Sequence, residues 1–399
     1  MEIGLVGKPN VGKSTFFSAA TKAPTEIGNY PFTTIEPKKG VAGVRFPCPH
    51  VALGLPQCDP KNAPCVDGTR WVPVELIDVA GLVKGAHEGR GLGNKFLDDL
   101  RQASCLLHII DAAGATDAEG QPAPLGTGDP AADAAMLEAE LEHWILGILT
   151  KGGWPAIARR VESGQAKLDE AVHERLSGLG VAHAHVVHAL KNAGLSDVKP
   201  TRWDDAKLLV LAREIRRVSK PMLVAGNKAD MATDDQLARL AAFEPPALPT
   251  CANSELALRK AADAGVVRYT PGGQAFEVVD PGRLSADQTK GLEYIRTHVF
   301  GRFGGTGVQA AIEQAVYELL HLIVVFPVED ETHYKDGKGN VLPDAHLVPH
   351  GTTARGLAYR VHTDLGEHFI RAIDAKRKKV VGADHALQPG DVVRIVSKT

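Results

Sequence analysis

The first 21 residues constrain the fold more than any other part of the chain. A short apolar strand pattern at 2–6 is followed by a helical pattern at 15–21, and between them lies Gly7-Lys8-Pro9-Asn10-Val11-Gly12-Lys13-Ser14. When a G-x-x-x-x-G-K-S loop connects a strand to a helix, its backbone N–H groups point inward and surround phosphate oxygens. The segment therefore predicts a phosphate-binding loop at the carboxyl edge of a mostly parallel sheet.

The roles of individual loop residues follow from phosphate chemistry. Lys13 is expected to neutralise the β- and γ-phosphate oxygens, and Ser14 to place its hydroxyl on Mg²⁺. The motif by itself does not choose between ATP and GTP. The loop residues that we predict to contact the nucleotide are Gly7, Asn10, Val11, Gly12, Lys13, Ser14 and Thr15.

A second apolar strand pattern, at 72–77, ends in Asp78-Val79-Ala80-Gly81. An aspartate at the carboxyl end of such a strand can hold Mg²⁺ through a water molecule, which is the role predicted for Asp78. Because glycine lacks a side chain, the N–H of Gly81 is expected to approach the γ-phosphate closely. D-x-x-G is common by chance, but it gains weight when it follows a phosphate-binding loop.

A third strand pattern, at 220–226, ends in Asn227-Lys228-Ala229-Asp230. Guanine presents N1–H and an N2 amino group, two donors that one carboxylate can accept. Adenine presents an acceptor at N1 and would leave that carboxylate unsatisfied. Asp230 therefore predicts GTP rather than ATP, with Lys228 over the base plane and Asn227 tying this loop to the phosphate-binding loop.

A weaker base-contacting pattern lies at 249–255. Cys251 and Ala252 stand where many GTP-binding proteins carry Ser-Ala. The backbone N–H of Ala252 is expected to meet the guanine O6 atom, whereas the thiol at position 251 departs from the usual hydroxyl.

Strand patterns alternate with helical patterns along most of the chain, which predicts an α/β fold: a P-loop NTPase domain with a mostly parallel sheet. The expected strands are 2–6, 72–77, 105–110, 221–226 and about 247–251. The predicted domains are a discontinuous G domain (1–125 and 204–275), an inserted helical domain (126–203), a helical linker (276–321) and a small C-terminal α+β domain (322–399).

The insertion begins with Asp129-Pro130, a good cap and first residue for a helix that runs to about Lys151. Further helical patterns occur at 155–176, 181–193 and 204–217, and beyond the G domain at about 285–300 and 307–321. The insertion is predicted to be a separate helical domain, including the alternative of a coiled-coil hairpin. An elaborated crossover of the G domain is the competing interpretation.

Composition excludes few functions but sets the context. The chain has 399 residues, with 45 Lys plus Arg against 48 Asp plus Glu, so nucleic-acid contact would need a local basic patch. Its five cysteines are too few for a disulfide framework in a chain of this size. The N-terminus lacks the pattern of a signal peptide, and no apolar run is long enough to span a membrane. A cytoplasmic protein without membrane contact is expected, with a monomer favoured.

Together these segments resemble the YchF branch of the Obg-like GTPases, in its archaeal form with an intact guanine motif. The residues that carry the resemblance are GKPNVGKS at 7–14, NYPFTTIEP at 29–37, DVAGLVKGAHEGRGLGNKFLDDLRQA at 78–103, NKAD at 227–230 and a C-terminal pattern similar to a TGS domain. The resemblance implies an inserted helical domain, a TGS domain and an association with ribosomes or translation. Many relatives have lost NKxD and prefer ATP, so their nucleotide preference does not transfer.

The resemblance also implies roles for residues in mobile loops of such GTPases. Thr34, rather than Thr33, is expected to ligate Mg²⁺ and sense the γ-phosphate. The glycine-dense segment 79–93 suits a second switch that orders only in some states. In a group of similar GTPases an asparagine at the position of Asn10 helps to bind K⁺; the alternative is that Asn10 only braces the loop.

Hydrolysis is the least determined step. Leu82 occupies the position at which the best-known GTPases carry a water-orienting glutamine, and leucine can neither donate nor accept a hydrogen bond. The predicted catalytic residues are Lys13, Thr34, Gly81 and His108, where His108 either assists hydrolysis or is a buried core histidine. His87 is a further candidate, with a solvated loop residue as its alternative.

Two groups remain open. Cys48, His50, Cys58 and Cys65 could bind Zn²⁺ tetrahedrally, but the spacing lacks any C-x-x-C pair, and unpaired thiols in a long hairpin are the alternative. The basic run 376–379 could contact RNA phosphate or form a solvated turn.

The sequence thus predicts a protein that binds GTP and GDP and hydrolyses GTP slowly with Mg²⁺. It would act as a regulatory switch on the ribosome or another RNA–protein assembly. Two other classes stay open: a nucleotide-gated scaffold, and a metabolic P-loop NTPase, although no separate set of substrate-directed groups is evident.

Overall fold

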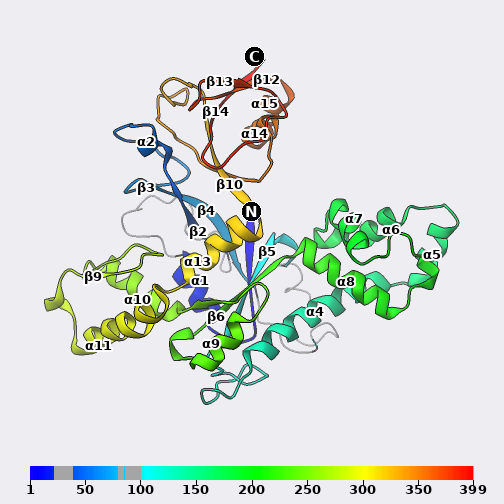
Figure 1. The fold of residues 1–399 in the computed structure, drawn as a ribbon, viewed down its shortest axis with the longest axis horizontal. Helices are drawn as coiled ribbons and strands as arrows, with labels where there is room; N and C mark the ends of the chain where they lie inside the picture. The colour runs from blue at the N-terminus through cyan, green and yellow to red at the C-terminus, as the bar shows by residue number, and fades with distance from the viewer. Residues whose placement is uncertain (22–38, 80–84, 86–99, 399) are drawn as a thin grey trace. The chain divides into compact units, whose positions relative to one another are not determined.

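The structure is a computed structural model that describes residues 1–21, 39–79, 85 and 100–398 (Figure 1). Its contacts divide the chain into two units. The first comprises Met1–Ala20 and Leu76–Ala311, and the second comprises Thr21–Glu75 and Ile312–Thr399. The domain boundaries predicted above stay a prediction, and each unit is described by itself.

The first unit is built on a sheet in which β1, β5, β6 and β7 lie in that order, next to the last residues of β4 (76–78). The pairs β1–β5, β5–β6 and β6–β7 are parallel, so their carboxyl ends share one edge. The predicted strands are confirmed, although β7 is shorter than expected and β4 longer. Their bounds are β1 Glu2–Val6, β4 Thr69–Asp78, β5 Cys105–Asp111, β6 Met222–Asn227 and β7 Leu248–Thr250. Helices α1 (Lys13–Thr21), α9 (Asp234–Ala241) and α10 (Ala252–Asp263) follow β1, β6 and β7.

Five α-helices and two short 3-10 turns lie between β5 and β6 (Figure 1). The predicted helix start is confirmed, because the Asp129 side chain caps α4 by accepting a hydrogen bond from the N–H of Ala131 at 3.0 Å. The single pattern at 155–176 is wrong: it forms two helices, separated where Gly164 adopts a left-handed φ of 77°. The elements are α4 Pro130–Thr150, α5 Trp154–Glu162, α6 Leu168–Leu176, η3 Ser177–Leu179, α7 His183–Asn192, η4 Pro200–Arg202 and α8 Asp205–Ser219.

The helical insertion has its own apolar core. Buried side chains from α4 to α8 form one cluster, which includes Leu149, Ile157, Val172 and Leu211. Trp154 and Trp203 stack within it, with ring centroids 5.0 Å apart. The insertion is therefore a compact helical bundle, and the coiled-coil hairpin alternative is wrong.

After β7 the chain adds a small hairpin and a second helical segment. The Ser285 side chain caps α11 by accepting from the N–H of Gln288, and the helix continues into a π-helical stretch. The predicted helical pattern at 285–300 is confirmed, and so is that at 307–321, which begins in this unit and ends in the second. The elements are β8 Val267–Arg268, β9 Glu277–Val278, η6 Pro281–Arg283, α11 Ala286–Tyr294, η7 Ile295–Phe300, α12 Gly301–Phe303, α13 Val308–Gln314 and η8 Ala315–Leu319.

The second unit contains a five-stranded sheet of order β11-β10-β14-β12-β13, in which β10 and β14 are parallel. Its core includes Ile323, Val325, Leu357 and Val393. The elements are β10 Leu322–Val328, β11 His346–Pro349, α14 Ala354–Val361, α15 Thr363–Glu367, β12 Phe369–Asp374, β13 Lys379–Val381 and β14 Val392–Ser397. This is the small C-terminal α+β fold that the sequence predicts.

The same unit includes the earlier segment from β2 (Lys39–Pro47) through α2 (Pro49–Ala52) and β3 (Cys65–Val66) into β4. Strand β2 neighbours β4, and β3 forms an antiparallel hairpin with it.

The basic turn between β12 and β13 is partly engaged with its own domain. Arg377 pairs with Asp374 at 2.8 Å, and the Lys378 ammonium lies 4.7 Å from the centre of the Tyr334 ring. RNA contact by this turn stays a prediction. Within the described residues, none of the helices has the length and apolarity needed to cross a membrane.

Candidate nucleotide-binding site

The loop between β1 and α1 has a backbone that only small residues allow. Gly7 has φ 153°, and a Cβ there would lie 2.3 Å from the carbonyl oxygen of Ile109. Gly12 has φ 93°, and its Cβ would lie 2.2 Å from Nδ2 of Asn227. Since contacts under 3 Å are not tolerated, both glycines are required by close approach to neighbouring strands.

Lys13, Ser14 and Asp78 converge at the carboxyl edge of the sheet. The Lys13 ammonium pairs with one carboxylate oxygen of Asp78, and the Ser14 hydroxyl donates to the other at 2.9 Å. The Lys13 and Asp78 side chains are mostly buried, at 12% and 18% exposed. Carboxylate and hydroxyl oxygens are the ligands that Mg²⁺ prefers, so Ser14 and Asp78 fit the predicted metal role. Thr34 and Gly81 lie outside the described residues.

Asn227 joins three motifs through its side-chain amide. Its Nδ2 donates to the carbonyl oxygen of Val11 at 2.9 Å, and its Oδ1 accepts from the backbone N–H of Ala252 at 3.0 Å. The residue is buried. The predicted tie between the guanine motif and the phosphate-binding loop is confirmed. The N–H of Ala252, which was expected to meet the guanine O6 atom, donates to Asn227 in this structure, so the O6 contact stays a prediction.

Lys228 is held by a residue that the sequence analysis did not select. It has a left-handed φ of 60°, and its ammonium donates to the carbonyl oxygen of Asn10 at 3.0 Å. It also pairs with the fully buried carboxylate of Asp111 at 2.8 Å. Asp111 ends β5, and its place at the carboxyl end of a buried strand was the available signal.

Asp230 lies in the short 3-10 turn η5 (Ala229–Met231) that follows β6. The Tyr294 hydroxyl donates to its carboxylate at 3.2 Å, and the Tyr294 ring stacks on His298 with centroids 4.3 Å apart. Burial, and then the negative charge of Asp230, raise the pKa of the Cys251 thiol. Tyr294 was not predicted, because α11 carries no nucleotide motif that marks it.

Two residues of the phosphate-binding loop contact the segment that runs from the end of β5 into α4. The buried Lys8 ammonium pairs with Asp133 and also donates to the Asp117 carbonyl at 2.7 Å. Burial raises the pKa of the Asp133 carboxyl, and the nearby Lys8 opposes that shift. The Asn10 side chain donates to the Gly120 carbonyl at 2.9 Å, which is a bracing contact; K⁺ ligation by Asn10 stays a prediction.

Gly85 is the one described residue between 80 and 99, within the segment predicted to be the second switch. Its backbone N–H donates to the carboxylate of Glu140 in α4 at 2.6 Å. The helical insertion thus holds part of the chain that follows Asp78.

His108 lies in the interior of the sheet, in register with Val6 on one side and Val224 on the other. Burial lowers its pKa to about 3, so the imidazole is neutral at pH 7. Its Nδ1 atom has no hydrogen-bond partner within the described part of the chain. A catalytic role for His108 stays a prediction.

Comparisons with known families agree with this geometry. Residues 2–137 match the family described as 50S ribosome-binding GTPase. Residues 225–330 match the Obg-like GTPase YGR210-like, G4 motif-containing domain, and residues 338–397 match the TGS domain.

Whole-chain relatives cover almost the full length. A GTP-binding protein of Methanocaldococcus jannaschii is 48% identical over 99% of this chain and 98% of its own. One from Schizosaccharomyces pombe is 37% identical over 97% and 95%. The Escherichia coli protein named ribosome-binding ATPase YchF is 28% identical over 98% of both. The crystal structure of a GTP-binding protein from Pyrococcus horikoshii is 43% identical, covers 100% of both chains and superposes with a TM-score of 0.78.

The fold and the site define a P-loop GTP-binding protein with a helical insertion and a C-terminal TGS domain. The chain belongs to the Obg-like GTPases, and proteins named YchF are among its whole-chain relatives.

Proposed function

We propose that this protein is a regulatory switch that binds GTP and hydrolyses it slowly with Mg²⁺. The ribosome or another RNA–protein assembly would recognise its nucleotide state. The observation that carries the proposal is the Asn227 side chain, which bonds the phosphate-binding loop to the guanine motif. A base read by Asp230 would thereby be fixed relative to the groups that hold the phosphates.

The chain's own residues supply most of the binding chemistry. Lys13 would neutralise phosphate oxygens, while Ser14 directly and Asp78 through water would hold Mg²⁺, which when bound would screen the charge that develops on the phosphates. Gly7 and Gly12 let backbone N–H groups approach. Thr34 and Gly81 are assigned the γ-phosphate contacts on sequence grounds.

Selectivity for guanine rests on the Asp230 carboxylate. Guanine supplies two donors to it, and adenine supplies none at the matching positions. The Tyr294 hydroxyl donates to the same carboxylate, so it orients Asp230 and competes with the base for its oxygens. Lys228, held by Asp111, is positioned on the loop that flanks the base.

Slow hydrolysis follows from the residue after Gly81. Leu82 cannot orient the attacking water, and even a GTPase with the glutamine in place hydrolyses at only about 10⁻⁴–10⁻³ s⁻¹ unaided. A partner that supplies the missing group can add about 10³–10⁵-fold. His108 is the internal candidate for that group.

Ribosome binding is supported by relatives and by domain content. Several bacterial relatives at 28% identity bear the name ribosome-binding ATPase. Residues 338–397 match the TGS domain, which we propose as the part of the chain that docks on the partner.

Single-turnover GTP hydrolysis, measured with and without added ribosomes, tests the proposal. The expected result is a rate well below 1 s⁻¹ that rises at least tenfold with ribosomes. The Asp230→Asn variant, supplied with the same GTP concentration, is the matched control for guanine-dependent turnover. A fast rate in isolation, or equal affinities for GTP and ATP, would overturn it.

A further inference from the structure

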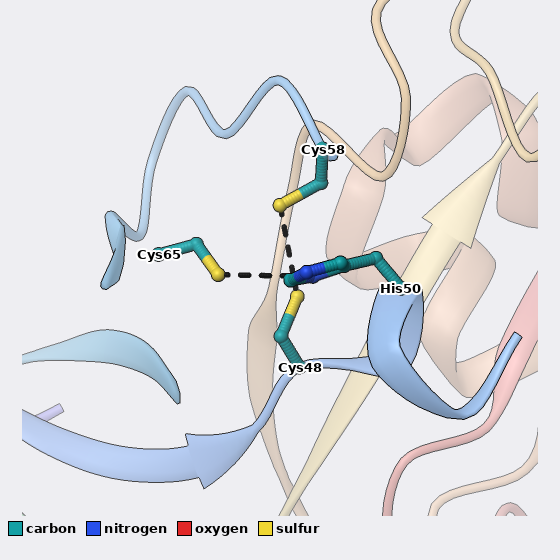
Figure 2. Close-up of side chains that lie close together, drawn as sticks. All are labelled: Cys48, His50, Cys58 and Cys65. Atoms are coloured by element: carbon teal, nitrogen blue, oxygen red, sulfur yellow. Dashed lines mark hydrogen bonds between the residues drawn. The ribbon is translucent and has the colours of Figure 1, made fainter. Parts of the chain in front are cut away.

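Four side chains with metal-binding atoms gather in the hairpin that joins β2 to β4 (Figure 2). Cys48 directly follows β2, and His50 lies in α2. Cys58 comes from the loop beyond α2, and Cys65 begins β3. All four belong to the second unit.

The spacing of these atoms fits one metal ion. The sulfur atoms of Cys48 and Cys58 are 3.8 Å apart, and the Cys65 sulfur lies 3.8 Å from Nδ1 of His50. All four ligand atoms lie within 4.8 Å of one another, and Figure 2 shows the side chains pointing to a common centre. With Zn–S bonds of about 2.3 Å, the edge of a tetrahedron is about 3.8 Å. A disulfide needs sulfur atoms at about 2.05 Å, which none of these thiols approaches.

Backbone hydrogen bonds hold the ligands in this arrangement. The N–H of Cys48 donates to the carbonyl oxygen of Gly68 at 2.8 Å. Asp67 and Gly68 both have positive φ, 46° and 75°, as a tight hairpin turn requires. That turn pairs Cys65 with Arg70 across the hairpin. The two ends of the cluster are thus brought together by the β3–β4 turn.

A buried cation beside the cluster gives an independent reason to expect negative charge there. Arg70 is fully buried, and its Nη2 lies 3.4 Å from the Cys48 sulfur. Its other bonds go to the carbonyl oxygens of Ala63 and Leu342, and among the described residues it forms no ion pair with a carboxylate. A buried charge is costly unless it is compensated. Zn²⁺ with three thiolates and a neutral imidazole carries one net negative charge, which matches the guanidinium.

We propose that Cys48, His50, Cys58 and Cys65 bind one Zn²⁺ as a structural site, with Arg70 donating to the Cys48 thiolate from outside the ligand set. Three sulfur atoms and one imidazole nitrogen select zinc over the harder Mg²⁺. Four protein ligands leave no open position for a reacting water, which separates a structural zinc site from a catalytic one.

The segment between the last two ligands pairs with the C-terminal part of the same unit. The N–H of Asp59 donates to the Val341 carbonyl at 2.8 Å, and its carboxylate accepts from the N–H of Val341 at 3.0 Å. The Asn62 amide forms two such bonds with Ala345, at 3.0 and 2.9 Å. Zinc would therefore fasten loop 53–64 where it contacts segment 341–345.

Metal analysis of the full-length protein, purified under reducing conditions without a metal-binding tag, tests the site. We expect about one zinc per chain. After the metal is stripped with a chelator, added Zn²⁺ should rebind, and Co²⁺ should give the intense visible absorption of a tetrahedral thiolate site. A chain that holds no zinc and takes up neither ion would overturn the proposal. A Cys48–Cys58 disulfide in the freshly purified protein would also overturn it.

Variants separate the cluster from other thiols. The double variant Cys58→Ser with Cys65→Ser should lose the zinc, whereas Cys105→Ala, which removes a buried thiol from β5, should keep it. His50→Cys should retain zinc through four sulfur ligands, and His50→Ala should bind it less tightly. Full zinc retention in the double variant would contradict the assignment.

One readout does not depend on the variants folding. Removal of zinc from the native protein should raise the rate of proteolysis within 53–64 at least severalfold, and re-addition should reverse it. GTP affinity should stay within twofold, so this result can be distinguished from a failure of the nucleotide site. An unchanged cleavage rate would show that the metal does not fasten the loop, contrary to the proposal.

Discussion

The nucleotide site and the cysteine cluster are assembled in different ways. The nucleotide site joins residues far apart in the chain: 64 positions separate Ser14 from Asp78, and 216 separate Asn227 from Val11. The cluster joins near neighbours, with ten positions between Cys48 and Cys58 and fifteen between His50 and Cys65. A parallel sheet positions the first set, whereas one hairpin turn positions the second. The first site should therefore keep its shape without its ligand, and the second should depend on its metal.

The largest effect is expected from a substitution that changes only the nucleotide site at the edge of the sheet. Lys13→Ala removes the cation that faces the phosphates, and loss of one such stabilising group costs about 10²–10³-fold in rate. Single-turnover hydrolysis at saturating GTP measures it.

Leu82→Ala is the matched control for that substitution, because it removes an apolar side chain with no hydrogen-bonding group. Its rate should stay near that of the native protein. Zinc content should be unchanged in both variants, and a zinc loss in Lys13→Ala would show that the two regions are not independent.

The next effect concerns base recognition. Asp230→Asn replaces an acceptor by a donor opposite the guanine N2 amino group, and loss of a charged hydrogen bond costs about 1.5–3 kcal/mol. We expect GTP affinity to fall about 10–100-fold and affinity for xanthine nucleotides to rise, as measured by titration. Tyr294→Phe, which leaves the carboxylate intact, should change GTP affinity far less. An equal loss in both variants would place recognition on the tyrosine.

A pH-dependent effect should follow from His108. Its folded pKa of about 3 lies below the ordinary value near 6.5, so the unfolded chain binds the extra proton between those values. Stability is then lost as pH falls from about 6.5 towards 3, by up to about 1.4 kcal/mol per pH unit. Urea unfolding of His108→Gln between pH 4.5 and 7 should show a shallower slope than the native protein.

The same variant tests catalysis. A large loss of hydrolysis with unchanged GTP affinity would assign His108 a role in the reaction, whereas an unchanged rate would leave it a core residue. If the unfolding free energy of His108→Gln depends on pH as steeply as that of the native protein, His108 is not the group that titrates.

The smallest expected effect is the dependence of the hydrolysis rate on the monovalent cation. If Asn10 helps to bind K⁺, hydrolysis should be a few times faster in K⁺ than in Na⁺ at matched ionic strength, and Asn10→Ala should abolish the difference. If Asn10 only braces Gly120, rates in the two salts will be identical and the variant will weaken GTP binding equally in both.

Predictability differed between the two regions for physical reasons. The contact of Asn227 with the phosphate-binding loop could be predicted from the sequence, because guanine and phosphate recognition demand fixed residue types next to strand ends. Asp111 and Tyr294 were missed because their roles depend on packing partners 117 and 64 positions away. The four proposed zinc ligands lack a recognised spacing, and they are brought together by the β3–β4 turn and by the bonds of Asp59 and Asn62 to Val341 and Ala345. The break in helix 155–176 depended on the backbone that Gly164 adopts.

The division of the second unit into two stretches of chain has a consequence for biosynthesis. Arg70 is made early, but its partner Leu342 lies 272 positions later, so the hairpin cannot complete its packing until the C-terminal stretch has left the ribosome. Throughout that interval the nascent chain carries three cysteines in one short segment, open to oxidation or to pairing with other chains. An ion captured as soon as Cys65 emerges would protect those thiols and hold the hairpin folded until its partner arrives.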